Sequence, residues 1–314
     1  MKDDHNHLVA QSKEQRVISC MREIFIMRPE VMIAIDAYRR LLTLPRLSDN
    51  PCMSIIAKSG QGKSTIGSFM AKQSCAPNSD WPGKIIYLDL VRHSGNLDLT
   101  KLMLMEIGLQ FSPNKKPLNR SYRDLATAER LIEENNVRGV VVDEAQLLYK
   151  GLSDLRREVN LASAKGFSGL NWGLNVCFMG DPDQLEALFR MDDTISSRFN
   201  LRTATLPLLK CNDAFIAFVK GFVELMPLRQ KSIIDNSFCV KLLKLAEKTI
   251  ISDYKKEVYS PLRSVVTILR EASMIAIESG DEYINAKSLD RAYLVLQSKA
   301  DTQAYLDRYT DLEE

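Results

Sequence analysis

A glycine-rich segment that runs into a lysine and two hydroxyl residues is the part of this sequence best suited to hold a phosphate. Residues 57–65 read Ala-Lys-Ser-Gly-Gln-Gly-Lys-Ser-Thr and match the pattern GxxxxGK(S/T), except that Ala57 replaces the first glycine. Backbone N–H groups at a helix start favour an anion. In this pattern Lys63 reaches the β- and γ-phosphates, and Ser64 places its hydroxyl on Mg²⁺. The predicted nucleotide-binding residues are Ser59, Gly60, Gln61, Gly62, Lys63, Ser64 and Thr65.

An apolar run at 140–142 leads into two adjacent carboxylates, Asp143 and Glu144. Asp143 is expected at the carboxyl edge of a sheet, where it would bind Mg²⁺ opposite Ser64, and Glu144 would orient and polarise an attacking water. Each motif alone also has a purely structural interpretation, as a glycine-rich turn or as an apolar strand that ends in Asp-Glu. Their combination predicts hydrolysis of a nucleoside triphosphate, because a nucleotide kinase has no particular use for Glu144.

Short apolar runs alternate with helical patterns up to Pro207. This alternation predicts an α/β fold with a parallel sheet flanked by helices. After Pro207 we expect helices and no further strands. The expected strands are 53–57, 84–90, 139–143, 175–180 and a weaker 201–206; the expected helices include 63–75, 97–109, 212–226, 237–249, 261–279 and 286–297.

The helix expected at 261–279 has the clearest boundaries. Ser260 can cap it, Pro261 suits its first position, and Gly280 follows its end. Residues 1–15 are predicted to be a loose polar tail, and 14–44 two amphipathic helical runs that separate near Arg28. The predicted organisation is therefore an N-terminal tail with helices (1–50), an α/β core (51–207), a helical subdomain (208–300) and an acidic tail (301–314).

The composition is that of an ordinary globular protein and does not by itself indicate a function. The chain has 314 residues, 45% of them hydrophobic and 26% charged, with a net charge of +2, as in ordinary globular proteins. No apolar run is long enough to span a membrane, and Met1–Gln15 does not resemble a secretory signal, so a cytoplasmic protein is expected. The six cysteines and three histidines show no zinc-binding spacing, which favours reduced, mostly buried thiols.

The order of the motifs resembles that of AAA+ P-loop ATPases. The phosphate loop is followed by DEAQ at 143–146, MGDPDQL at 179–185 and SSRF at 196–199. A predicted helical bundle then contains SPLR at 260–263. From about Glu14 to Gln297 the chain is similar in particular to transposition regulators of the TnsC/TniB type. The resemblance implies an AAA+ fold with a C-terminal helical lid, with ATP and Mg²⁺ as ligands.

The resemblance also assigns roles to three further residues. Asp181 occupies the sensor position near the γ-phosphate, where family members more often carry Thr or Asn; it is otherwise a helix cap before Pro182. Arg198 matches an arginine finger that would complete a neighbouring subunit's site, with Arg190 as the next candidate. Arg263 matches the lid sensor. A solvated surface arginine is the alternative for Arg198, and a helix-face arginine for Arg263.

A basic loop at 114–123 offers a surface for nucleic acid. Its charges can neutralise phosphates without reading bases, although most such loops are only solvated. The family forms rings or filaments on duplex DNA and connects a TniQ-type target selector with the transposase, so the resemblance implies the same partners here. The alternatives are another DNA-acting AAA+ loader ATPase or a weakly hydrolysing, nucleotide-gated scaffold. The candidate DNA-binding residues are Arg92, Lys101, Lys115, Lys116, Arg120 and Arg123.

Overall fold

The computed structural model describes residues 2–199, 203–252 and 255–310. Two compact units make up the chain. The sheet unit spans Pro29–Pro207, and the helical unit combines Met1–Arg28 with Leu208–Glu314. The segment grouped in the sequence analysis as 1–50 is therefore shared between the two units, because its first helices pack with the C-terminal ones.

Five parallel strands form the centre of the sheet unit, in the order β2-β3-β4-β1-β5. This confirms the α/β fold and the parallel sheet. The strand expected at 201–206 is shorter, and residues 201 and 202 lie outside the described part of the chain. The strands are β1 (Met53–Ile56), β2 (Lys84–Asp89), β3 (Val137–Asp143), β4 (Asn175–Gly180) and β5 (Thr203–Thr205).

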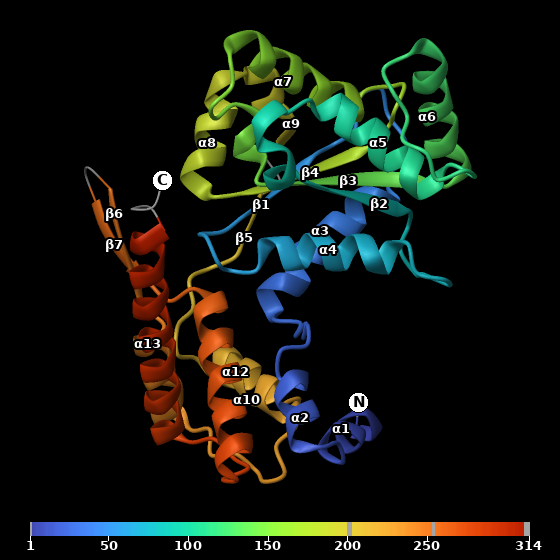
Figure 1. The fold of residues 1–314 in the computed structure, drawn as a ribbon. Helices are drawn as coiled ribbons and strands as arrows, with labels where there is room; N and C mark the ends of the chain where they lie inside the picture. The colour runs from blue at the N-terminus through green and yellow to red at the C-terminus, as the bar shows by residue number, and fades with distance from the viewer. Residues whose placement is uncertain (1, 200–202, 253–254, 311–314) are drawn as a thin grey trace. The chain divides into compact units, whose positions relative to one another are not determined.

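Helices cover both faces of this sheet (Figure 1). On one face lie α3 (Pro29–Thr43) and α4 (Lys63–Ser74), and on the other α5 (Leu99–Phe111), α6 (Tyr122–Glu134) and α7 (Asp154–Ser168). Strands covered on both sides read as continuous apolar runs, which is why the strand pattern was visible in the sequence. Short helices complete the unit: η1 (Leu90–Asn96), η2 (Ala145–Leu148), α8 (Pro182–Met191) and α9 (Asp193–Phe199).

The core of the sheet unit is apolar, with one buried tyrosine that fixes α3 to the sheet. Tyr38 is fully buried, and its hydroxyl lies 2.8 Å from the carbonyl oxygen of Asn175 in β4, to which it donates. A buried phenol needs such a partner. The apolar side chains of β3, including Val140 and Val142, fill the space under the helices of the opposite face.

The helical unit contains two strands in a region where the sequence predicts only helices. They are β6 (Lys248–Ser252) and β7 (Lys255–Tyr259), which pair antiparallel. The prediction of helix up to residue 249 was wrong there, since β-branched residues favour a strand. The other elements are α1 (Lys2–Val9), α2 (Lys13–Ser19), α10 (Asp213–Glu224), α11 (Asn236–Leu245), α12 (Leu262–Ser279) and α13 (Ala286–Thr310).

Two further differences from the expected helix boundaries concern the N-terminus and the start of α12. Where a loose tail was expected, Lys2–Val9 is helical. Ser260 does not cap α12; its hydroxyl donates to the carbonyl of Leu243, and Pro261 holds the cap position without a side-chain bond. Gly280 ends α12 with φ 84°, as predicted. Residues 311–314 of the acidic tail lie outside the described chain, within which no helix is long and apolar enough to cross a bilayer.

A buried ion pair joins α2 to the loop after α12 inside the helical unit. The side chain of Arg16 is 2% exposed and forms a bidentate pair with Glu282, and its Nε donates to the carbonyl of Pro227 at 3.0 Å. Burial raises the pKa of Glu282, but the hydrogen bonds and the charge of Arg16 outweigh this, so the pKa lies below its ordinary value. The N-terminal segment is therefore held to the helical unit by charge as well as by packing.

We expect Glu282→Ala to destabilise the helical unit by about 3 kcal/mol, because the variant leaves the buried guanidinium of Arg16 unpaired. A lowered carboxyl pKa contributes stability at neutral pH that is lost as the pH falls through the folded-state value. The difference in unfolding free energy between wild type and variant, measured in urea, should therefore shrink below about pH 4. Asp290→Ala removes the exposed pair with Lys241 and should change stability by less than about 1 kcal/mol; equal effects of the two variants would contradict this account.

Candidate active site

Three neighbouring strands bring the predicted site residues to one edge of the sheet. The carboxyl ends of β1, β4 and β3 are adjacent because β4 pairs with both of the others. The segment 57–65 follows β1, Asp181 follows β4, and Asp143 with Glu144 ends β3. Parallel sheets bind ligands outside the carboxyl ends of their strands, so the topology gathers the phosphate loop and the acidic residues where a nucleotide would lie.

The phosphate loop uses its glycines where the backbone requires them. Gly60 and Gly62 have φ of 77° and 91°, a region that other residues rarely adopt. Ala57 does not have a positive φ, so a glycine is not needed there, and this explains the departure from the pattern. Lys63 is 6% exposed, and its Nζ donates to the carbonyl of Ala57 at 2.8 Å. Gln61 is also buried, whereas Ser59, Ser64 and Thr65 are exposed.

A tyrosine that no sequence motif indicated binds one of the two predicted Mg²⁺ ligands, Asp143. The Tyr87 hydroxyl on β2 donates to Oδ2 of Asp143 at 2.8 Å, and Ser64 lies near it. Burial and the nearby carboxylate raise the pKa of Tyr87, so the phenol remains a donor. Hydroxyl and carboxylate oxygens suit Mg²⁺, which commonly takes only one or two protein ligands. Ser64 and Asp143 therefore fit this ion.

We expect Tyr87→Phe to raise the Mg²⁺ concentration needed for tight nucleotide binding by about 10- to 100-fold, as for other residues that orient metal ligands. The variant leaves the ring in place and removes only the hydroxyl that donates to Asp143. Fluorescent ATP-analogue binding measured against Mg²⁺ concentration tests this. Tyr149→Phe, which loses a hydroxyl bonded to the carbonyl of Gln184, is the control. An unchanged Mg²⁺ dependence in Tyr87→Phe would show that this contact is dispensable.

Glu144 occupies a constrained backbone position at the end of β3. Its φ of 52° is left-handed, which is uncommon for a residue with a side chain and recurs at functional sites. Its amide donates to Oδ1 of Asp143 at 3.0 Å, and its carboxylate accepts a hydrogen bond from the side chain of Gln146. The two adjacent carboxylates thus have different partners, Tyr87 for Asp143 and Gln146 for Glu144.

Asp181 is the N-cap of α8, which is one of the two roles predicted for it from the sequence. Its carboxylate accepts from the amide of Asp183 at 3.1 Å. The sequence did not show that Lys58, in the phosphate loop, lies 2.7 Å from Asp183 and 3.9 Å from Asp181. This lysine offsets the negative charge at the start of α8, so an acidic residue next to a phosphate site is tolerated electrostatically.

The three arginines of the sequence analysis have different surroundings. The Arg198 side chain is 23% exposed; it pairs with Asp49 at 2.5 Å and donates to the carbonyl of Lys165 at 2.9 Å. Within one chain it therefore joins α9 to α7 and is not simply solvated. Arg190 is an exposed partner of Glu186, and Arg263 is exposed in the first turn of α12, in the helical unit.

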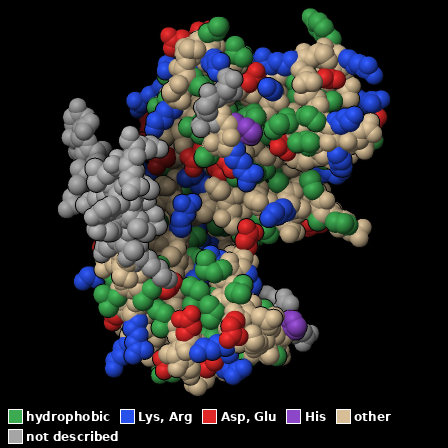
Figure 2. All heavy atoms as spheres, in the orientation of Figure 1, with side chains coloured by type: hydrophobic (Ala, Val, Ile, Leu, Met, Phe, Trp, Pro, Cys, Tyr) green, Lys and Arg blue, Asp and Glu red, His purple; other side chains and the backbone are tan. Residues whose placement is uncertain are grey.

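The basic candidates follow the length of α5. Arg120 pairs with Asp98, the N-cap of α5, at 2.6 Å. Lys115 donates to the carbonyl of Gln110, near the other end of the helix. Figure 2 shows lysine and arginine side chains gathered over the region of α5 and α6. Lys101, Lys116 and Arg123 are exposed in this region, Arg123 in the first turn of α6 and not in a loop, and Arg92 pairs with Asp89.

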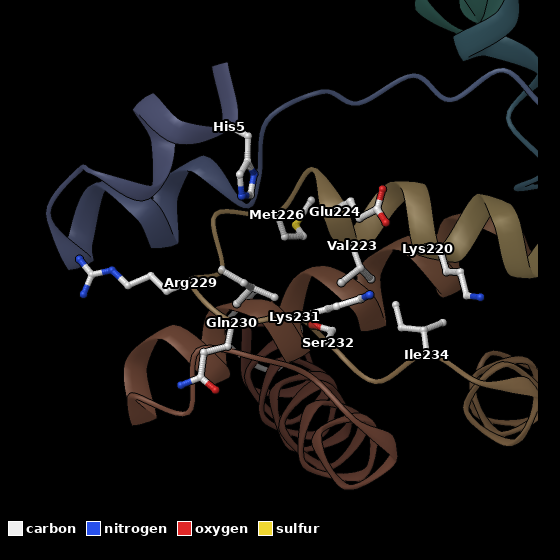
Figure 3. Close-up of a pocket in the computed structure, with 11 residues that line it drawn as sticks. His5, Lys220, Val223, Glu224, Met226, Arg229, Gln230, Lys231, Ser232 and Ile234 are labelled. Atoms are coloured by element: carbon white, nitrogen blue, oxygen red, sulfur yellow. The ribbon is translucent and has the colours of Figure 1, made fainter. Parts of the chain in front are cut away.

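A separate cavity of about 570 Å³ lies in the helical unit (Figure 3). Its walls come from α10, from the loop after it and from His5 of α1. Apolar side chains such as Val223 and Met226 line it together with Lys220 and Lys231. None of the predicted site residues borders it, so the cavity is independent of the sheet edge.

The sheet order and the phosphate loop between β1 and α4 define an AAA+ P-loop NTPase fold, and solved structures agree. The Aeropyrum pernix ORC1 protein in complex with DNA aligns with TM-score 0.60 and 12% identity over 89% of this chain and 69% of its own. The A. pernix ORC2 protein, with ADPNP and ADP, gives 0.54 and 17% over 86% and 70%. Drosophila ORC bound to DNA gives 0.54 and 15% over 94% and 68%.

The family model described as "Bacterial TniB protein" matches residues 16–207, more than half of the chain. The protein therefore belongs to the TniB family, which confirms the family predicted from the order of the motifs. No curated protein matches the chain.

Proposed function

We propose that this protein is an ATP-dependent regulator of transposition that assembles on duplex DNA and connects a TniQ-type target selector with the transposase. The observation that carries the proposal is the shared sheet edge of a TniB-family chain, where the phosphate loop meets Asp143 and Glu144. A binding site alone has no need for two adjacent carboxylates, and this favours a hydrolytic switch.

The residues at the sheet edge have separate roles in ATP hydrolysis. The amides of the loop from Ser59 to Thr65 and the Lys63 ammonium hold the phosphates. Mg²⁺ bound by Ser64 and Asp143 would neutralise phosphate charge. Glu144 accepts the proton of the attacking water. Asp181, which lies beside Lys58, would sense the γ-phosphate, and Arg263 would report the nucleotide to the helical lid.

The basic residues along α5 are the proposed DNA surface. Their charges can neutralise phosphates without reading bases, so binding should depend on phosphates and be tolerant of sequence. Two structures of the same fold, A. pernix ORC1 and Drosophila ORC, are described as DNA complexes, which supports DNA as the partner.

The test is DNA binding with and without a non-hydrolysable ATP analogue, measured by fluorescence anisotropy over a range of salt concentrations. Binding should require the analogue. The logarithm of the association constant should fall steeply as the logarithm of the salt concentration rises. The triple variant Lys101→Gln, Lys115→Gln, Lys116→Gln should bind more weakly and with a shallower salt slope. A variant with the same charge change in the helical unit, at Lys220, Lys231 and Lys287, should match the wild type. DNA binding without nucleotide would contradict the proposed switch. Equal losses of affinity in the two triple variants would contradict the proposed DNA surface.

We also infer that Arg198 acts on the nucleotide of a neighbouring subunit. Arg198→Ala should reduce kcat by about 1,000-fold or more, the range for an arginine finger, as measured by phosphate release. Because Arg198 also pairs with Asp49, Asp49→Ala is the control that breaks this pair and keeps the guanidinium. That control should retain most of the activity.

Mixing two inactive variants separates action between subunits from action within one. Arg198→Ala keeps its own phosphate loop, and Lys63→Ala keeps its arginine. If the arginine acts between subunits, the mixture should hydrolyse ATP where each variant alone does not. Full activity of Arg198→Ala alone would move the finger to another residue such as Arg190. If both variants are inactive and the mixture does not recover, Arg198 does not act between subunits.

A further inference from the structure

Gln146 of η2 is a buried amide with a role that neither the sequence motifs nor the family match assigns. It is 6% exposed, and its Nε2 donates to Oε2 of Glu144. Its Oε1 is buried and has no hydrogen-bond partner among the described residues. Buried polar groups without partners are rare and ask for an explanation.

The end of β4 leaves room for this amide only because residue 180 is a glycine. A Cβ at Gly180 would lie 2.6 Å from Oε1 of Gln146 and 2.9 Å from Cγ of Leu185, closer than real Cβ contacts. Two adjacent strand ends therefore fix the amide: β3 continues into the turn that carries it, and β4 supplies the space. The sequence places Gln146 and Gly180 far apart, and only the pairing of β3 with β4 brings them together.

The contact has a chemical consequence for Glu144. The backbone of Glu144 is held in a left-handed conformation, but its side chain has free torsions until something binds the carboxylate. The Gln146 amide occupies one carboxylate oxygen and leaves the other for a water. An amide donates a hydrogen bond to a carboxylate without giving up its proton.

We propose that Gln146 is a positioning residue for hydrolysis, which holds the Glu144 carboxylate in its working orientation, and that Gly180 makes this arrangement possible. The inference deepens the proposed ATPase function and rests on it. Gln146 itself touches neither the phosphates nor the water; it acts through Glu144.

The first test replaces the amide by an apolar side chain of similar volume. Gln146→Met should lower kcat about 10- to 100-fold, as expected when a catalytic group is misplaced. The KM for ATP and the affinity for a fluorescent ATP analogue should remain within about twofold of wild type, because the phosphate loop is unchanged. In a Glu144→Gln background the same substitution should have little further effect, since residues that act through one another are not additive.

The second test uses Gly180 as an independent way to displace the amide. Gly180→Ala should reproduce the loss of kcat at unchanged analogue affinity. In a Gln146→Ala background the added methyl no longer meets Oε1, so the second substitution should have little further effect on kcat. Its remaining conflict with Leu185 should appear as the same lowering of Tm in both backgrounds.

The outcomes separate this inference from the function on which it rests. If Glu144→Gln abolishes hydrolysis but Gln146→Met keeps the wild-type kcat, or loses ATP affinity in proportion to kcat, the positioning role is overturned and the ATPase stands. If wild type does not hydrolyse ATP, or Glu144→Gln is fully active, the proposed function fails first. A selective loss of kcat in both Gln146→Met and Gly180→Ala supports the inference.

Discussion

Glu144→Gln is expected to lower kcat for ATP hydrolysis about 100- to 10,000-fold, the range for loss of a general base, while ATP affinity stays near that of wild type. Glutamine has the same shape as glutamate but cannot accept the proton of the attacking water. Asp143 and the phosphate loop are untouched, so the nucleotide still binds. Phosphate release measures kcat, and binding of an ATP analogue measures the nucleotide affinity.

The same variant should form long-lived assemblies on DNA, because ATP remains bound and the signal to disassemble is lost. Dissociation from labelled duplex DNA after dilution, followed with ATP present, should be much slower than for wild type. Glu158→Gln, an exposed carboxylate of α7, removes the same charge and should behave as wild type. Rapid release of Glu144→Gln from DNA with ATP present would contradict the role of Glu144.

Lys63→Ala is expected to abolish ATP-dependent DNA binding. The Lys63 ammonium is nearly buried and donates a hydrogen bond to the carbonyl of Ala57. Its positive charge would offset the negative charge of the bound phosphates. Removing one partner of such a buried charge pair weakens binding by about 30- to 1,000-fold. Calorimetry with an ATP analogue and anisotropy with duplex DNA should both show the loss.

Lys72→Ala provides the matched control, since Lys72 lies on the same helix α4 but is exposed in its last turn. It should keep nucleotide and DNA binding. If Lys63→Ala still assembled on DNA in response to ATP, the loop at 57–65 would not be the nucleotide site.

Much of the sheet unit was predictable because its strands are buried on both faces and its site residues follow them directly in sequence. The apolar runs before Lys63, Asp143 and Asp181 predicted β1, β3 and β4, and the sheet order then brought the three positions to one edge. A buried parallel strand has a strong local signal. The site residues that such strands carry can therefore be found from the sequence.

The residues that tune the site were not predictable, since their partners lie on other elements. Tyr87 looked like one more member of the apolar run at 84–90, and its single hydroxyl was the only sign of its contact with Asp143. Gln146 acts across the turn after β3 and depends on Gly180 of β4. Lys58 reaches Asp183 from a separate strand end. These contacts depend on which strands are neighbours, and strand order is not a local property of the chain.

The helical unit was less predictable for a different reason. The strands β6 and β7 are short, and exposed apolar side chains at Ile250 and Val258 give no buried-strand signal. The pairing of Arg16 with Glu282 joins residues from opposite ends of the chain, so no sequence window contains both. The assignment of Met1–Arg28 to this unit thus became visible only in the structure.

Calorimetric titration of the purified protein with Mg²⁺ and a non-hydrolysable ATP analogue tests the nucleotide site most directly. Saturable binding of one analogue per chain is expected, with little binding when Mg²⁺ is removed, because the loop amides, Lys63, Ser64 and Asp143 act on a metal-bound triphosphate. A folded protein that takes up no triphosphate at any Mg²⁺ concentration would contradict the assignment of the sheet edge, and with it the switch proposed for assembly on DNA.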